Sequence, residues 1–192
     1  MTSAPLPDLA GAWLLVVDPQ RIFADPESQW GSLMFGDIIA PVHHLAERLG
    51  PQRTVVTRWV PGRSRVGSWA DYFAAWPFAD RPDDDPMFAL VGQAEEISAH
   101  PTVDVPTFGK WGEDLVDVVG PTPTLLVTGV STDCCVVSTV LAAADAGARV
   151  VVVTDGCAGS SREHHTAALH VIGLYPPQVV LATSAEVLTA LG

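Results

Sequence analysis

Two adjacent cysteines, Cys134 and Cys135, are the residues of this sequence best suited to nucleophilic chemistry. They follow a short apolar run, Leu125–Thr128, and a glycine, Gly129, and a segment with helical spacing begins at them. The run predicts a buried strand and the glycine a tight turn, so both cysteines are expected in a first helical turn. There the helix dipole lowers the pKa of a thiol and favours the nucleophilic thiolate. A cysteine that only packs in the core is the alternative, and residue chemistry does not choose between the two.

Asp18 and Lys110 are the charged residues expected beside the cysteines. Asp18 ends the apolar run Trp13–Val17, which predicts a central strand, and Lys110 lies between a short strand, Val103–Thr107, and a helical segment. In a parallel sheet the carboxyl ends of the strands share one edge, where ligands bind. A carboxylate, an ammonium and a thiol from three different strands are therefore expected to meet there. Taken singly, each charged residue has a simpler explanation, a turn cap for Asp18 and a solvated loop for Lys110.

The rest of the chain alternates between strand and helix patterns. Strands are expected over 53–60, 149–155 and 178–183, and helices over 36–49, 68–76, 162–174 and 184–191. This alternation predicts an α/β fold, a three-layer α-β-α sandwich around a mostly parallel, doubly wound sheet. With 192 residues the chain is expected to form a single domain, 1–192. Pro41 fits a helix that starts just before it.

The composition restricts the class of protein and its partners. A hydrophobic share of 48% and a charged share of 17% are typical of a compact globular protein. The net charge of -12 argues against nucleic acid or an anionic membrane as a partner, and favours a small-molecule substrate. That substrate is expected to be neutral, cationic, or an anion held by a few basic groups. Three cysteines imply no disulfide framework, and without a secretory signal pattern they favour a cytoplasmic location.

Two loops supply candidate walls for a binding pocket. Arg63 and Arg65 follow the second strand, and this basic patch fits either a substrate carboxylate or a solvated loop. Six aromatic side chains, five of them between residues 59 and 76, fit a pocket wall, the core or a subunit interface. They are Trp30, Trp59, Trp69, Tyr72, Phe73 and Trp76.

Three segments, in order, resemble the isochorismatase-like cysteine hydrolases, a superfamily that includes nicotinamidases, N-carbamoylsarcosine amidases and isochorismatases. The segments are LLVVDPQRIF around Asp18, TFGKWGEDL around Lys110, and VTGVSTDCCVVSTVLAAADAGARVVVVTDGCA around Cys135. The resemblance itself covers nearly the whole chain. The family has its nucleophile at the fourth position of a Thr-Asp-x-Cys-Val pattern, which selects Cys135 here and leaves Cys134 and Cys157 as packing residues.

The resemblance implies a role for each motif residue. Asp18 takes the thiol proton and later activates water, Lys110 stabilises the thiolate, and Cys135 attacks a substrate carbonyl. A cis peptide bond is implied between Val130 and Ser131, with backbone N–H groups near Ser131 and Cys135 holding the oxyanion. The expected reaction is hydrolysis of a C–N bond in a small amide or ureido compound through a thioester. The expected assembly is a homodimer or homotetramer.

Two departures from the family pattern change the expected site. Nicotinamidases carry metal-binding histidines after the second strand, but this chain reads TRWVPGRSRVG there, so we predict no metal and no other cofactor, and nicotinamide is not favoured as the substrate. In the pattern Asp-x-Gln-Asn-x-Phe, Arg21 replaces the asparagine. We expect Gln20, Phe23, Trp59 and Trp76 to contact substrate, with bracing of the loop as the alternative for Gln20.

Two other functions remain open. Isochorismatase-type hydrolysis of a vinyl ether proceeds in some family members with the aspartate as acid and without a thiol; the complete Asp, Lys and Cys set favours C–N hydrolysis instead. The other is a non-catalytic member that binds a small molecule, or a redox-sensing pair of Cys134 and Cys135. The geometry of a disulfide disfavours that pair within a helix.

Overall fold

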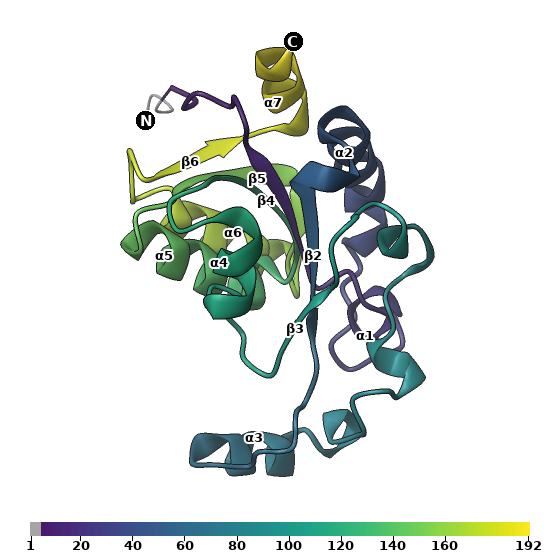
Figure 1. Cartoon of the computed structure of the whole chain (residues 1–192). Coiled ribbons are helices and arrows are strands. Elements are labelled where there is room, and N and C mark those ends of the chain that lie inside the picture. The colour runs from purple at the N-terminus through teal and green to yellow at the C-terminus, as the bar shows by residue number, and fades with distance from the viewer. Residues whose placement is uncertain (1–4) are drawn as a thin grey trace.

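Six parallel strands form the centre of the computed structural model, which describes residues 5–192 (Figure 1). The strands are β1 (Trp13–Val17), β2 (Thr54–Trp59), β3 (Val103–Val105), β4 (Thr124–Val130), β5 (Arg149–Ala158) and β6 (Val179–Ala182). They pair in the order β3-β2-β1-β4-β5-β6, and every pair is parallel. From β1 the next strands, β2 and β3, are added on one side, and β4, β5 and β6 follow on the other. The direction of strand addition therefore reverses between β1 and β4. This confirms the predicted doubly wound α/β fold.

Helices cover both faces of the sheet. On one side lie α2 (Phe35–Leu49) and α7 (Ser184–Leu191), and on the other α4 (Glu113–Val119), α5 (Val137–Asp145) and α6 (Arg162–Ile172) (Figure 1). Two further helices, α1 (Arg21–Ala24) and α3 (Ser68–Ala75), follow the carboxyl ends of β1 and β2. The C-terminal helix α7 lies at the opposite end of the molecule from α3 (Figure 1).

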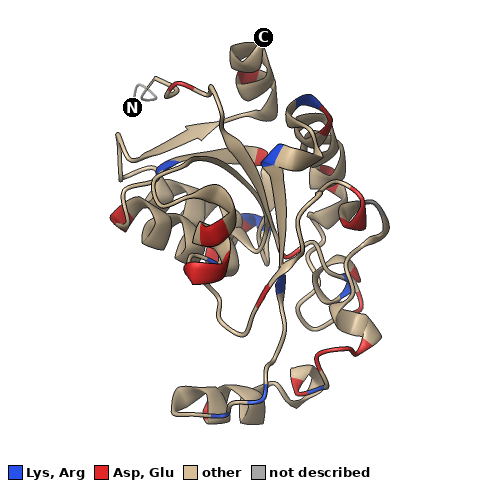
Figure 2. Cartoon of the chain, in the orientation of Figure 1, with Lys and Arg blue, Asp and Glu red and all other residues tan. Residues whose placement is uncertain are grey.

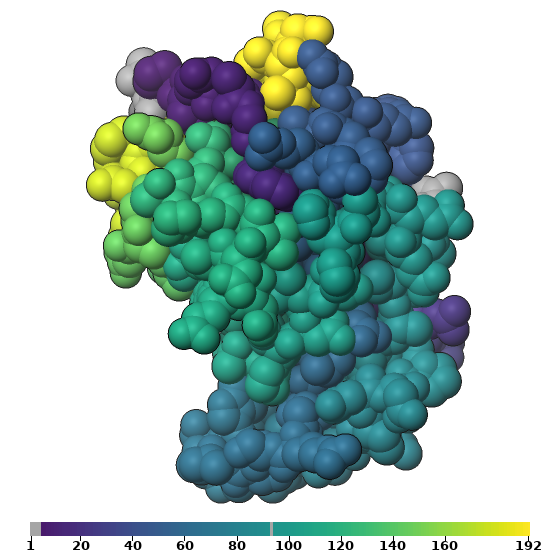
Figure 3. Space-filling model, in the orientation of Figure 1, coloured from purple at the N-terminus to yellow at the C-terminus, as the bar shows by residue number. Residues whose placement is uncertain are grey.

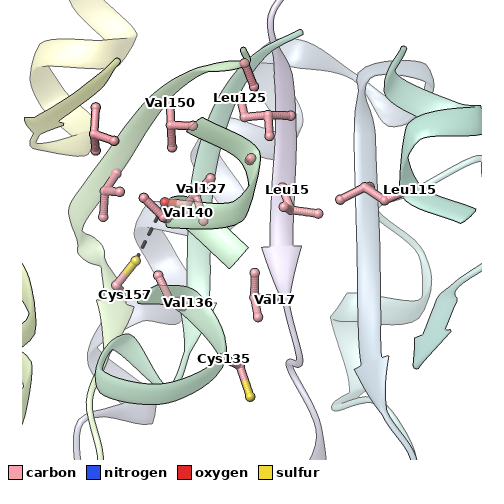
Figure 4. Close-up of a cluster of buried hydrophobic side chains, with 14 of the residues drawn as sticks. Leu15, Val17, Leu115, Leu125, Val127, Cys135, Val136, Val140, Val150 and Cys157 are labelled. Atoms are coloured by element: carbon pink, nitrogen blue, oxygen red, sulfur yellow. Dashed lines mark hydrogen bonds between the residues drawn. The ribbon is translucent and has the colours of Figure 1, made fainter. Parts of the chain in front are cut away.

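Alternate residues of the central strands fill two separate cores. Leu15 and Val127 pack against α4, α5 and α6 (Figure 4), whereas Leu14 and Leu126 pack against α2 and α7. Successive side chains of a strand point to opposite faces, so a strand covered on both sides must be apolar throughout. This is why the central strands appear in the sequence as continuous runs such as WLLVV and RVVVV.

A third apolar cluster lies over the carboxyl edge of the sheet. It joins α1, the start of α2, the end of β2, α3 and the short 3-10 turns that follow. Its buried members are Ile22, Phe23, Met34, Phe35, Ile38, Trp59, Val60, Phe73, Ala79, Phe88, Val130 and Ala158. The segment that contains α3 projects from the rest of the molecule (Figure 3). The loops after β1 and β2 therefore form one packed wall above the sheet edge.

Several element boundaries differ from the predictions, and Gly129, which was expected to form a tight turn, lies inside β4. α2 begins at Phe35, so Pro41 lies inside the helix rather than near its start. Phe35 and Ile38 are buried on the helix together with Val42, and this apolar burial stabilises the turns before the proline. β5 continues to Ala158, beyond the predicted end of the strand.

Within residues 5–192, no helix has both the length and the apolar composition that crossing a bilayer requires.

Acidic residues lie on many of the elements, with a concentration on α4 (Figure 2).

Candidate active site

Asp18 follows β1 directly and is completely buried. Its backbone φ of 50° is in the left-handed region, which aspartate tolerates better than most residues. The hydroxyl of Thr57 on β2 donates to Asp18 Oδ1 at 2.7 Å, and the Asp18 backbone N–H donates back to that hydroxyl at 3.2 Å. On the opposite side, β4 approaches so closely that a Cβ at Gly129 would lie 2.1 Å from the carbonyl oxygen of Val17. Two neighbouring strands therefore fix the position of the carboxylate.

Lys110 forms a buried ion pair with Asp18. The Lys110 Nζ lies 2.9 Å from Asp18 Oδ2, and neither side chain has measurable solvent exposure. The ammonium also donates to the Thr107 carbonyl at 2.9 Å. The Lys110 backbone N–H donates to the Thr139 hydroxyl, and that hydroxyl donates to the Cys135 carbonyl at 2.7 Å. Thr139 therefore ties the lysine loop to the cysteine-bearing segment, a link that the sequence analysis did not predict.

Cys135 lies in a π-helical turn, Thr132–Val136, between β4 and α5. The Val136 N–H donates to the Ser131 carbonyl at 3.1 Å, five residues back in the chain. A wide turn therefore replaces the regular first helical turn that was expected. The peptide bond between Val130 and Ser131 is cis, which confirms the geometry implied by the resemblance.

The Asp18 carboxylate raises and the Lys110 ammonium lowers the pKa of the Cys135 thiol, and the Thr139 hydroxyl links the backbones of Lys110 and Cys135. Figure 4 shows Cys135 at the border of the apolar core beside Val17, the residue before Asp18. A hydrogen bond with Cys134, burial and the Asp18 carboxylate raise the pKa of Cys135 well above its ordinary value. Burial and the Asp18 carboxylate therefore oppose the lowering of the Cys135 pKa that was expected from its place at the helix start. The buried thiol keeps its proton until a base removes it.

The other two cysteines differ from Cys135 and from each other. Cys134 is half-buried, and its hydrogen bond with Cys135 lowers the pKa of the Cys134 thiol. Cys157 is buried in β5, its thiol donates to the Val127 carbonyl (Figure 4), and burial raises its pKa. All three cysteines are free thiols.

A cavity of about 420 Å³ opens above the cysteines. One wall is aromatic and is centred on Trp30, whose ring centroid lies 5.3 Å from that of Trp59 and 5.8 Å from those of Tyr72 and Trp76. The aromatic lining consists of Phe23, Trp30, Trp59, Tyr72, Trp76 and Phe108, and the remaining lining of Gln29, Gly31, Ser131, Asp133, Cys134, Cys135, Ser160 and His164. The dimensions suit a small molecule.

Three of the four predicted substrate contacts, Phe23, Trp59 and Trp76, line this cavity, and Gln20 does not. Gln20 is completely buried, and its Nε2 donates to the carbonyls of Trp59 and Phe88 at 2.9 and 2.8 Å. Its Oε1 accepts from the Trp59 N–H at 2.8 Å. The amide therefore braces the loop after β1 against the end of β2. Bracing is the role that these contacts support, in place of the predicted substrate contact.

The basic loop does not reach the cavity lining either. The Arg65 guanidinium pairs with Asp80, donates to the Gly62 carbonyl at 3.0 Å and lies 3.8 Å from the ring centroid of Phe73. Arg63 is exposed. Arg65 therefore holds its own loop onto α3, and the solvated-loop interpretation fits Arg63.

The cavity also has a polar wall, formed by Asp133, Ser160 and His164, which was not predicted. Asp133 Oδ1 accepts from the Ser160 backbone N–H at 2.8 Å, and Oδ2 accepts from the Ser160 hydroxyl at 2.7 Å. Ser160 Oγ also lies 2.8 Å from His164 Nδ1 on α6. The neighbouring His165 contacts the Thr132 hydroxyl through Nδ1 at 2.8 Å, and burial lowers the pKa of that imidazole. The only available signal was the polar run SSREHH directly after an apolar strand.

The donors of a nicotinamidase-type metal site are missing at the position where the resemblance would place them. β2 ends in Arg58 and Trp59, where such enzymes carry histidines. Within residues 5–192, no three His, Cys, Asp or Glu side chains form a group able to hold a metal ion. The residues present do not fit that metal.

Comparisons with known proteins agree with the motifs and the fold. The model of the isochorismatase domain matches residues 12–186. A cysteine hydrolase from Pseudomonas syringae pv. phaseolicola superposes with a TM-score of 0.75 at 20% identity, covering 98% of this chain and 95% of that one. An isochorismatase-like hydrolase from Alkaliphilus metalliredigens gives 0.74 at 16% identity, covering 94% and 99%.

A third structure, the nicotinamidase PncA from Bacillus subtilis, gives a TM-score of 0.70 at 17% identity, covering 90% of this chain and 99% of that one. The search of curated proteins found no significant match. Because the domain model spans nearly all of the described chain, the assignment does not depend on these distant structural likenesses. The chain belongs to the isochorismatase family of hydrolases.

Proposed function

We propose that this protein is a metal-independent cysteine hydrolase that cleaves a C–N bond of a small amide or ureido compound. The observation that supports this most strongly is the buried Asp18–Lys110 pair, whose charges act on Cys135 below an aromatic cavity. Burying an ion pair is costly, and it is retained where a site requires a carboxylate in a fixed position. A thiol with a raised pKa requires such a base.

In the first half-reaction, Cys135 attacks the carbonyl carbon of the substrate while Asp18 takes the thiol proton. Asp18 Oδ2 faces the Lys110 ammonium at 2.9 Å, and a carboxylate oxygen keeps a second lone pair that can take that proton. The Lys110 ammonium offsets the negative charge as it moves onto sulfur. Backbone N–H groups near Ser131 and Cys135 stabilise the oxyanion. The C–S bond forms, the C–N bond breaks, and the leaving nitrogen takes the proton from Asp18.

In the second half-reaction, water attacks the thioester and Asp18 takes a proton from it. The C–O bond forms, the C–S bond breaks, and the proton on Asp18 returns to the sulfur of Cys135. The sum is one amide and one water converted to a carboxylic acid and an amine or ammonia. Both half-reactions use the same three residues, so no further group is required for the balance.

A panel assay tests this function. The purified protein is incubated with primary amides, ureido compounds and isochorismate, while ammonia release and ether cleavage are measured separately. We expect ammonia release from at least one C–N substrate, and no release with the Cys135→Ala variant. Cleavage of isochorismate that persists in Cys135→Ala supports the ether hydrolase instead, because acid catalysis by Asp18 does not need the thiol. A protein that binds panel members and converts none is a non-catalytic member.

A further inference from the structure

The lining of the cavity restricts the charge of the substrate. Of the lining residues, all within the described chain, none is lysine or arginine, and the Asp133 carboxylate is the one constitutively charged group. Lys110 is buried and paired with Asp18, outside that lining. We propose that the substrate carries a positive charge on a group separate from the scissile C–N bond, and that carboxylate-bearing substrates are rejected. The identity of the scissile bond rests on the proposed function; the charge preference rests on the cavity.

Asp133 has no strong basic partner. In residues 5–192 neither a lysine nor an arginine forms an ion pair with it, and His164 Nδ1 lies 4.0 Å away. Its hydrogen bonds come from Ser160, two in all, whereas a carboxylate accepts about four. The side chain is 22% exposed, so its charge is only partly screened by water. An ammonium in the cavity would gain from this charge and a substrate carboxylate would be repelled.

The hydrogen bonds around Ser160 also leave Nε2 of His164 as a hydrogen-bond acceptor. Ser160 has one hydroxyl proton, and the Asp133 carboxylate has none to give, so that proton lies between Ser160 Oγ and Asp133 Oδ2. The Ser160–His164 hydrogen bond must then use the proton on His164 Nδ1. In the neutral imidazole this leaves Nε2 with a lone pair. The polar wall therefore offers acceptors, which match the N–H donors of an ammonium.

The aromatic wall favours the same charge. Six aromatic side chains line the cavity, and ring faces attract cations, most strongly when several rings surround a desolvated site. The protein's net charge of -12 raises the local concentration of cations further. A carboxylate would have to leave water for a cavity with aromatic faces, an anionic wall and no fixed cation. Three independent features thus agree on a cationic substrate.

Binding of three probes to the Cys135→Ala variant tests the preference without relying on turnover. Isothermal titration calorimetry is performed with benzamides that carry an aminomethyl, a hydroxymethyl or a carboxyl group at the para position. We expect the cation to bind about tenfold more tightly than the neutral probe, and the carboxylate to bind more weakly than the neutral probe. In the Asp133→Asn background the advantage of the cation over the neutral probe should disappear. Asp71→Asn, an exposed acid of α3 outside the lining, is the charge-matched control and should keep the preference.

Equal binding of the three probes, tighter binding of the carboxylate, or no binding of the cation overturns the proposal. So does loss of the preference in both aspartate variants, because the effect is then one of net charge. Failure of the proposed function gives a different result. In that case the Cys135→Ala variant shows the charge preference while the wild-type protein releases no ammonia from any probe.

Discussion

Cys135→Ala should lower kcat for the best panel substrate by on the order of 10⁴-fold or more, because removal of a covalent nucleophile leaves only binding and oxyanion stabilisation. Cys134→Ala should keep most of the activity. Both cysteines line the cavity, and Cys134 has the lower pKa, so thiol chemistry alone would favour Cys134. We favour Cys135 because it is the buried thiol and occupies the nucleophile position of the Thr-Asp-x-Cys-Val pattern.

Each of the two variants, Cys135→Ala and Cys134→Ala, is the control for the other, because each removes one thiol from the same turn. Ammonia release measured at saturating substrate separates loss of kcat from loss of binding. A Cys134→Ala variant that is inactive beside an active Cys135→Ala variant would move the nucleophile by one residue. Equal, small losses in both variants would argue against any covalent step.

Asp18→Asn should reduce kcat by about 10²-fold to 10⁴-fold, the usual effect of removing a general base. It should also destabilise the protein by about 3–5 kcal/mol, because the Lys110 ammonium is left buried without its counter-charge. Activity is measured by ammonia release, and the free energy of unfolding by urea denaturation.

The double variant Asp18→Asn with Lys110→Met separates the two effects. Replacing both members of a buried ion pair removes the uncompensated charge, so stability should recover most of what the single variant lost. Activity should not recover, since neither the base nor the ammonium is present. A double variant with restored activity would show that the single variant failed only because it was unstable, and that Asp18 is not the base.

The fold was predictable because its strands are covered on both faces. A strand such as Trp13–Val17 must be apolar at every position to fill two cores, and that pattern is local in the sequence. The same reasoning predicted that Asp18, Lys110 and one of the two adjacent cysteines meet, since it required only the order of strands and helices; the family pattern selected Cys135. Pro41 was misjudged because the burial of Phe35 depends on tertiary packing, which is not visible from helix propensity.

The details of the site depended on partners far away in the chain. Gln20 is bound by the backbone of Trp59 and Phe88, and Asp133 by Ser160, contacts that no local pattern specifies. The effects that raise the pKa of Cys135 were not visible in the sequence, because burial and the charge of Asp18 are tertiary properties, whereas the helix dipole is a local one. Residue type and strand order therefore predicted which groups converge, and tertiary contacts decided how each is held.

Mass spectrometry of the enzyme quenched in acid during turnover tests the covalent chemistry at Cys135 most directly. In the Cys134→Ala variant the peptide across the turn Thr132–Val136 contains a single thiol, so an acyl group on it has one possible position. We predict that this peptide gains the mass of the substrate acyl group within the first turnover, and that the Cys135→Ala enzyme shows no gain. An acyl group that persists in Cys135→Ala, or a full first turnover that leaves the Cys135 peptide unmodified, would contradict the account.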